Sequence, residues 1–364
     1  MSRLDKYLLR ALLLGLVFVT FAVTAAVWLT QSLRYVDVVV ENGAPLHMFV
    51  WLALLTLPTF LSIILPVALF VAVLFTYHKF IQDSELIAMR ACGMGPHALA
   101  RPALMLATGT MLVCFFMSMW LQPLASRELL RLQYFVQSQF SAALLKEGTF
   151  NDLGNRMTVY VARRDKNAEL SGLLIHDSRN PDKPVTIRAA RGQLVQAANG
   201  PQVIVYDGVQ QEYNRATKRL SELSFDSYAV GLDTLVPTMA GRTPLPRELS
   251  TGDLFIQMNS ETEPVRKSRL TSEFHQRITN PLLSLGFALI AACSLLFGEF
   301  NRRGNARRVF VAIALAALLE AVMLGLGQVA SRNSWAIPPL YFVALLPIIL
   351  GIEMLWRSER KRWC

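Results

Sequence analysis

The sequence predicts an α-helical membrane protein with six transmembrane helices and an inserted all-β, jelly-roll-like domain outside the membrane. First, 53% of the 364 residues are hydrophobic, more than an ordinary soluble domain of this length carries. Second, six apolar runs have roughly the 20 residues that cross a bilayer. Third, a long polar region separates three of these runs from the other three, and its short alternating stretches are typical of strands.

The apolar runs define three segments of the chain. Residues 1–121 hold the first three spans, residues 122–276 form the β domain with a helical connector, and residues 277–364 hold the last three spans and a basic tail. Pro58 and Pro66 lie inside the second span, where we expect kinks rather than a break. The spans are predicted at residues 11–33, 51–76, 103–121, 281–297, 309–327 and 337–356.

The distribution of positive charge predicts the orientation. Arginine and lysine residues gather at one end of the spans, whereas the short loops at the other end hold only Arg34 and Arg332. The positive-inside rule then places both termini in the cytoplasm and residues 122–276 outside. We therefore interpret the net charge of +10 as topogenic rather than as a nucleic-acid site. The clustered residues are Arg3, Lys6, Arg10, Lys79, Arg90, Arg101, Arg302, Arg303, Arg307, Arg308, Arg357, Arg360, Lys361 and Arg362.

The polar region is predicted to fold as a β-sandwich or jelly roll. Short apolar or alternating runs are separated by turn clusters such as Asn-Pro-Asp-Lys-Pro at 180–184. A Pro-rich connector follows residue 235, Ser250 and Asp253 cap a short helix, and residues 264–278 form a polar helix that leads into the fourth span. The strand predictions are 157–162, 170–176, 185–190, 193–197, 203–206 and 220–230.

Familiar catalytic and cofactor motifs are missing from the sequence. The four cysteines form no CxxC pair, which argues against a disulfide framework or a structural zinc site. The chain has neither a GxxxxGK[ST] phosphate loop nor a GxGxxG turn, so we expect it to bind no nucleotide by these routes. No HExxH or GxSxG motif occurs, and the five histidines are scattered. An intramembrane enzyme is therefore disfavoured, and no cofactor is expected.

A short charged helix is predicted between the second and third spans. Asp83 is placed to cap it, Glu85 lies in its first turn, and Gly93 ends it, which gives a helix over residues 84–92. Such a helix is too short to span a membrane. Its mixed surface, with Met89 and Arg90, favours docking to a cytoplasmic protein over lying flat on the membrane.

Three charged residues near the spans are candidates for a substrate site. Arg34 either snorkels to the headgroups or binds a phosphate at the mouth of a cavity. Glu320, in the middle of the fifth span, is expected to face a cavity or another helix rather than to relay protons. Arg277 either pairs with Glu273 across one helical turn or faces an anionic substrate.

Four stretches of the chain resemble the lipopolysaccharide-export permeases, the LptF/LptG family. They are Lys-Phe-x-x-Asp-Ser-Glu-Leu-Ile-Ala-Met-Arg-Ala-Cys-Gly-Met-Gly at 79–95, Leu57-Pro58, Leu-Pro-Val-Ala-Leu-Phe at 65–70 and Gln-Arg-Ile-Thr-Asn-Pro-Leu at 276–282. The run from Asp83 to Gly93 favours the LptF branch. The resemblance covers the whole chain and implies a multi-pass protein of the Gram-negative inner membrane with a periplasmic jelly roll.

The resemblance also implies partners and a substrate. A homologous six-span permease forms a heterodimer with this chain, and a separate cytoplasmic ATPase dimer binds the ATP. Lipopolysaccharide leaves the inner membrane and passes to periplasmic jelly-roll bridge proteins, whose edge strands join by β-augmentation. The ATPase is expected to contact the short helix through Asp83, Glu85, Leu86, Met89 and Arg90.

The alternative function is an envelope scaffold or mechanotransmission protein that moves no lipid. The interior of the β domain distinguishes the two functions. A transporter should show a continuous apolar groove that is open at one end, whereas a scaffold should show a packed core and a polar binding face.

Overall fold

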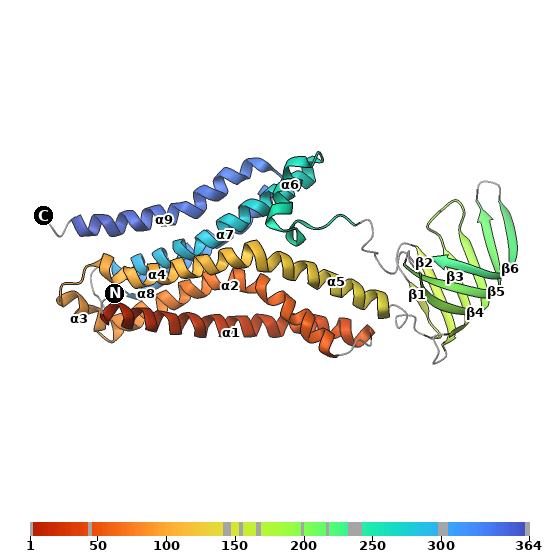
Figure 1. Ribbon diagram of the computed structural model, residues 1–364, viewed down its shortest axis with the longest axis horizontal. Helices are drawn as coiled ribbons and strands as arrows, with labels where there is room; N and C mark the ends of the chain where they lie inside the picture. The colour runs from red at the N-terminus through yellow and green to blue at the C-terminus, as the bar shows by residue number, and fades with distance from the viewer. Residues whose placement is uncertain are drawn as a thin grey trace. The chain divides into compact units, whose positions relative to one another are not determined.

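The computed structural model describes residues 3–42, 46–140, 147–152, 156–164, 169–197, 200–215, 218–231, 242–297 and 305–360. The chain divides into two compact units. One comprises Met1–Gln31, Leu55–Arg127 and Pro244–Cys364 and is helical (Figure 1). The other comprises Ser32–Leu54 and Glu128–Thr243 and contains a six-stranded sheet.

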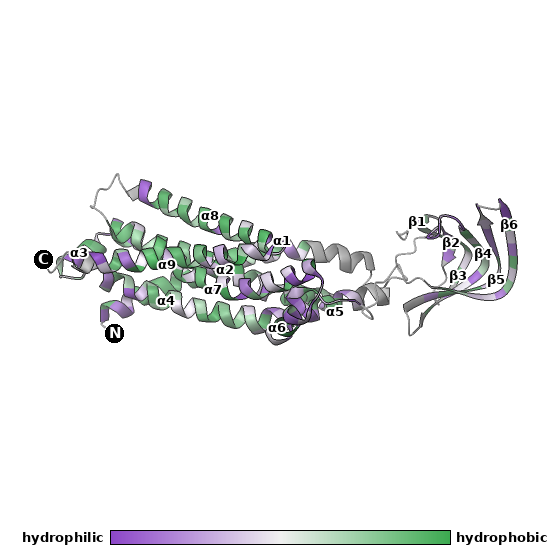
Figure 2. Cartoon of the chain, turned by 90° about the horizontal axis from the view of Figure 1, so that it is seen from above, coloured by the Kyte–Doolittle hydropathy of each residue, from purple (hydrophilic) through white to green (hydrophobic). Residues whose placement is uncertain are grey.

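Six helices are long and apolar enough to cross a membrane, which confirms the predicted fold class. Figure 2 shows predominantly hydrophobic residues along most of them. In its most apolar stretch, 67% of the α7 residues are buried within the chain, against 11% for α1. The helices are α1 (Arg3–Asn42), α2 (Leu46–Gln82), α3 (Glu85–Ala91), α4 (Pro96–Phe116), α5 (Gln122–Phe140), α6 (Thr251–Ser260), α7 (Pro264–Leu296), α8 (Asn305–Ala330) and α9 (Ile337–Arg360).

The helices extend beyond the apolar runs because their polar ends continue the same backbone hydrogen bonding. α2 is continuous through Pro58 and Pro66, as predicted. A π-helical turn, η1 (Met117–Leu121), joins α4 to α5, and α5 occupies a segment for which no helix was predicted. Ser250 caps α6 by accepting a hydrogen bond from the Asp253 amide, as predicted. The domain boundaries after residues 121 and 276 remain predictions.

The inserted region folds as one antiparallel sheet whose strands follow the order of the chain. The predicted strands are confirmed, except that the runs at 185–190 and 193–197 form one strand and that β1 was not predicted. Among the described residues the connections are those of a meander, without the crossover of a jelly roll. The strands are β1 (Phe150–Asp152), β2 (Met157–Arg164), β3 (Glu169–Asp177), β4 (Val185–Ala197), β5 (Gly200–Asn214) and β6 (Arg219–Gly231).

Along each of the middle strands, the alternation of inward and outward side chains shifts once. The positions of the shift lie on a line that crosses the strands. The register places Ala162, Gly172, Ala190 and Asp207 at one level in successive strands. Gly172 and Asp207 have φ of +67° and +53°, and such left-handed residues shift the inside–outside alternation by one position. Apolar side chains from both sides of this line therefore share one core.

The centre of that core is densely packed. Val161, Ile175, Val203 and Val205 are completely buried. A Cβ atom on Gly192 would lie 2.3 Å from Leu173 Cδ1, so the end of the Leu173 side chain would have to move. The described residues thus show a packed apolar core and, along the same sheet, an open hollow of about 430 Å³ whose lining includes Leu174, Ala189 and Val209.

Candidate functional site

A bend at Asp83 and Ser84 separates helix α3 from α2, and hydrogen bonds show where each helix ends. The predicted capping by Asp83 is wrong, because the Asp83 amide donates to Lys79 O at 2.9 Å and completes the last turn of α2. Ser84 takes the N-cap position instead, with φ of 62° and no side-chain cap. Gly93 ends the helix as predicted: its φ is +90°, and the Gly93 and Met94 amides donate to Arg90 O and Met89 O in a Schellman arrangement.

The side chains of α3 divide into an inward and an outward set. Leu86 is completely buried and Met89 is 8% exposed, and both belong to the core of the helical unit. These two residues were predicted to contact an ATPase, but they point into their own bundle. The exposed face of the segment holds Ile87, Ala88 and Ala91.

The two charged residues of α3 bind other helices of the same chain. The Tyr7 hydroxyl of α1 donates to Glu85 Oε2 at 3.1 Å, and the Tyr7 ring lies 5.9 Å from that of Phe80. Arg90 Nη2 donates to the Leu296 carbonyl at the end of α7. Tyr7 could not be predicted from the sequence, because 78 positions separate it from Glu85 and no local pattern links them.

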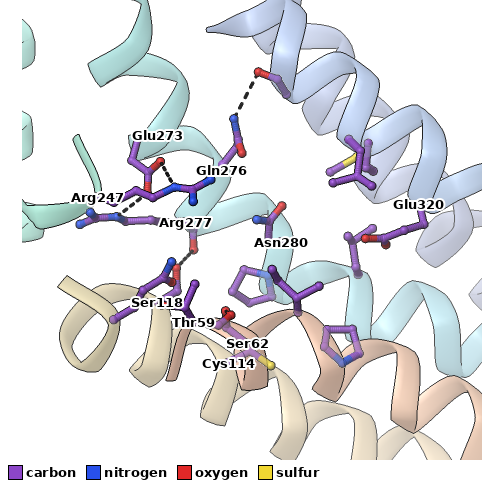
Figure 3. Close-up of a pocket in the computed structure, with 18 of the residues that line it drawn as sticks. Thr59, Ser62, Cys114, Ser118, Arg247, Glu273, Gln276, Arg277, Asn280 and Glu320 are labelled. Atoms are coloured by element: carbon purple, nitrogen blue, oxygen red, sulfur yellow. Dashed lines mark hydrogen bonds and ion pairs between the residues drawn. The ribbon is translucent and has the colours of Figure 1, made fainter. Parts of the chain in front are cut away.

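A polar cavity of about 170 Å³ lies within the helical unit (Figure 3). It brings together two of the predicted substrate residues, Arg277 and Glu320. The third, Arg34, lies in α1, but its side chain is outside the described residues. The polar lining comprises Thr59, Ser62, Cys114, Ser118, Gln122, Arg247, Glu273, Gln276, Arg277, Asn280, Glu320 and Gln328.

Arg277 is engaged by the protein itself. Its side chain is 4% exposed, and its Nε lies 3.5 Å from Glu273 Oε1, which confirms the predicted pair. Nη1 donates to Thr251 Oγ1 at 3.2 Å, and Nη2 donates to the carbonyls of Pro246 and Leu249 at 3.2 and 3.1 Å. The guanidinium therefore holds the connector against α7, which favours a structural role over binding of an anionic substrate.

The same junction includes the π-helical turn. Thr251 Oγ1 donates to Met119 O at 2.9 Å, and Ser118 Oγ donates to Arg277 O at 3.5 Å. Arg247, missed in the sequence analysis, lies 3.9 Å from Glu273 and has a side chain that is 69% exposed. Four elements, namely η1, the connector, α6 and α7, thus meet at one group of polar contacts.

Glu320 projects from α8 and lines the cavity, as expected (Figure 3). Glu273 lines the same cavity, but its carboxylate already interacts with Arg247 and Arg277. Within the described ranges, no hydrogen bond or ion pair involves the Glu320 carboxylate. The cavity therefore has a charged cluster on the α7 side and a separate carboxylate on α8.

The chain resembles known permeases along almost its whole length. It is 29% identical over 352 residues to an uncharacterized protein of Rickettsia prowazekii (strain Madrid E), which covers 96% of this chain and 97% of the relative. It is 24% identical to the lipopolysaccharide export system permease protein LptF of Escherichia coli (strain K12), over 75% of this chain and 73% of that one.

The lipopolysaccharide export system permease protein LptG of Haemophilus influenzae is also 24% identical, over 99% of both chains. Both branches are thus represented, and assignment to the LptF branch stays a prediction. A family model described as lipopolysaccharide export system permease LptF/LptG matches residues 6–360. The chain therefore belongs to the LptF/LptG family of multi-pass inner-membrane permeases.

Proposed function

We propose that this chain is a permease subunit that extracts lipopolysaccharide from the inner membrane and delivers it to a periplasmic bridge. The observation that carries the proposal is the family match over residues 6–360, together with six membrane-spanning helices and a separate sheet. The charge distribution supports cytoplasmic termini and a periplasmic sheet. The partner is a second six-span permease, and the chain itself is not catalytic.

A separate ATPase dimer supplies the energy and docks on the outward face of α3. Ile87 is 43% exposed and lies beside the small residues Ala88 and Ala91, which leave room for a partner side chain. This face replaces Leu86 and Met89 as the predicted contact, because those side chains are buried. Asp83 is exposed at the edge of the same face.

Substitution of Ile87 tests the docking face. We expect Ile87→Glu to abolish co-purification of the ATPase with the permease pair, because a charge would be buried in an apolar contact. Ile256→Glu is the control, since Ile256 is also an exposed isoleucine, on α6, and is 66% exposed. Retention of the ATPase by Ile87→Glu would exclude this face as its docking surface.

Arg247 is the better candidate for a substrate phosphate in the cavity. Its guanidinium is well exposed, whereas that of Arg277 is enclosed by four protein partners. Guanidinium groups bind phosphate oxygens in a bidentate manner. Arg34 remains a second candidate for binding a substrate phosphate. We expect Arg247→Glu to lower photo-crosslinking of lipopolysaccharide in the cavity, and unchanged crosslinking would exclude Arg247.

The packed core of the sheet favours the second candidate function, a scaffold that moves no lipid, whereas the open hollow along the same sheet favours transport. Under the transport proposal, the sheet must open to admit acyl chains to side chains such as Val205. A photo-reactive residue at position 205 should then crosslink lipopolysaccharide only while ATP is hydrolysed. The scaffold function predicts no lipid adduct at this position under any condition.

A further inference from the structure

We propose that a pocket between η1, the start of α5 and the start of α6 binds a phospholipid of the surrounding bilayer, whose headgroup carries a phosphate and a primary amine. The pocket has a volume of about 320 Å³, within the size range of small-molecule sites. None of the described residues that line it also lines the polar cavity. Its lining includes Trp120, Leu124, Arg127, Glu248, Ser250 and Thr251.

The first argument is the depth of this pocket in the membrane. α4, η1 and α5 follow one another along the third span, which has a charged residue, Arg101, near its start. Trp120 follows Arg101 by 19 residues, or about 28 Å of helix, close to the thickness of the hydrocarbon core. The Trp120 side chain is exposed, and tryptophan is enriched at the level of the headgroups. The pocket therefore lies where the headgroups of the bilayer meet the protein.

The second argument is an exposed apolar stripe that leads to the pocket. Leu112 and Phe116 are four residues apart in α4, so they lie on one face of the helix. The ring centroids of Phe116 and Trp120 are 5.7 Å apart, which extends this face across η1. Trp120 and Leu124 then line the pocket itself, and all four side chains are exposed. An acyl chain can lie along this stripe while its headgroup occupies the pocket.

The third argument is the charge around the pocket. Arg127 Nη2 lies 3.8 Å from Asp253 Oδ2, beyond hydrogen-bonding distance, and the two side chains are 54% and 53% exposed. The Arg127 guanidinium makes no hydrogen bond to another described residue, so it can bind a phosphate in a bidentate manner. Asp253 and Glu248 place two carboxylates near this one cation. This balance disfavours a lipid with several negative charges and favours one with an ammonium group beside its phosphate.

The fourth argument is the contact between the pocket and the polar junction of the helical unit. Thr251 and Met119 both line the pocket, and Thr251 Oγ1 donates to Met119 O at 2.9 Å. Thr251 Oγ1 also accepts a hydrogen bond from Arg277 Nη1 at 3.2 Å. A bound lipid would contact η1 and α6 on the two sides of this bond. Because a ligand that binds only the folded state stabilises it, the lipid should stabilise the junction.

The experiment uses the full chain in detergent, in the assembly with which it purifies. Native mass spectrometry counts the lipid bound per chain after addition of equal amounts of phosphatidylethanolamine and phosphatidylglycerol. We expect the wild type to retain phosphatidylethanolamine about fivefold better, and its thermal unfolding temperature to rise with this lipid. Arg127→Gln should lower this retention about fivefold and abolish the thermal shift. Arg131→Gln is the matched control, since Arg131 is also exposed on α5 but pairs with Glu128.

A second variant tests recognition of the amine separately from folding. Asp253→Asn should lose its preference for phosphatidylethanolamine and gain phosphatidylglycerol, because one carboxylate is removed while Arg127 remains. A misfolded variant would instead lose both lipids.

Equal retention of the two lipids by the wild type, or undiminished retention by Arg127→Gln, would overturn the inference. Displacement of phosphatidylethanolamine by an equal amount of lipopolysaccharide would also overturn it, because the pocket would then bind the transported lipid. The proposed function is independent of these outcomes, since it is tested by co-purification of the ATPase and by crosslinking in the cavity.

Discussion

The helical unit and the sheet bury their polar groups in opposite ways. In the helical unit, charged side chains form interior contacts where elements meet, and the Arg277–Glu273 pair is 4% and 16% exposed. In the sheet, the interior is apolar and the ion pairs lie on the surface, as in Arg191–Asp207 at 71% and 58% exposure. Polar contacts therefore define junctions in the helical unit, whereas side-chain packing defines the shape of the sheet.

The largest expected effect is at the polar junction of the helical unit. Replacement of Arg277 by Met removes the guanidinium that holds Pro246 and Leu249 and leaves buried acceptors without donors. Loss of one partner from a buried polar cluster costs about 3–5 kcal/mol. We expect a large fall in the thermal unfolding temperature of the purified chain in detergent. Arg247→Met is the control and should lower it little, because Arg247 is exposed.

The sheet should respond most to a change in packing. Gly208→Ala forces Phe225 and the neighbouring strand backbone to move, because the added Cβ would lie 2.5 Å from Phe225 Cζ and 2.7 Å from the Arg188 carbonyl oxygen, and overpacking costs about 1–3 kcal/mol. Limited proteolysis of the full chain should show faster cleavage between residues 147 and 231. Gly109→Ala in α4, where nothing lies within 4 Å of the added atom, should leave that rate unchanged. An unchanged rate in Gly208→Ala would show that the side chains around this position are loosely packed.

Surface ion pairs of the sheet should matter less. Arg191→Ala removes the pair with Asp207, and exposed pairs contribute about 0–1 kcal/mol. Denaturant unfolding of the full chain should shift only slightly. A loss of stability as large as that of Arg277→Met would show that polar contacts matter as much in the sheet as in the helical unit.

The smallest effect is a pH dependence at the turn after β3. Hydrogen bonds from Arg179 hold the pKa of Asp177 below its ordinary value of 3.8. Because the pKa is lower in the folded state, this contribution is complete above about pH 3.8 and is lost as the pH falls through the lowered value. Asp177→Asn should remove this acid-induced loss of stability. If stability fell with pH in the variant as it does in the wild type, other carboxylates would be responsible for the loss of stability in acid.

The sequence predicted the helical unit better than the sheet for physical reasons. A bilayer imposes a length and an apolar composition on each span, so the runs themselves located six helices. The shape of the sheet depends on residues with left-handed backbone conformations, such as Gly172 and Asp207. An alternating sequence pattern does not predict that an Asp will have a positive φ. α5 was missed because its mixed residues lack the continuous apolar signal of a span.

The candidate site was predicted only in part. The capping glycine, the Arg277–Glu273 pair and the cavity position of Glu320 could be inferred from local spacing. The bond between Tyr7 and Glu85 joins residues far apart in the chain, so only the packing of α1 against α3 reveals it. The inward orientation of Leu86 and Met89 likewise depends on which side of a seven-residue helix meets the bundle.

Release of lipopolysaccharide from vesicles is the most direct test of the central claim. The full complex containing this chain should transfer lipopolysaccharide to a soluble jelly-roll acceptor only when ATP is hydrolysed, and mass spectrometry should find the lipid bound to the resting complex. ATP hydrolysis without any transfer, in a complex that contains no bound lipopolysaccharide, would contradict a role in export.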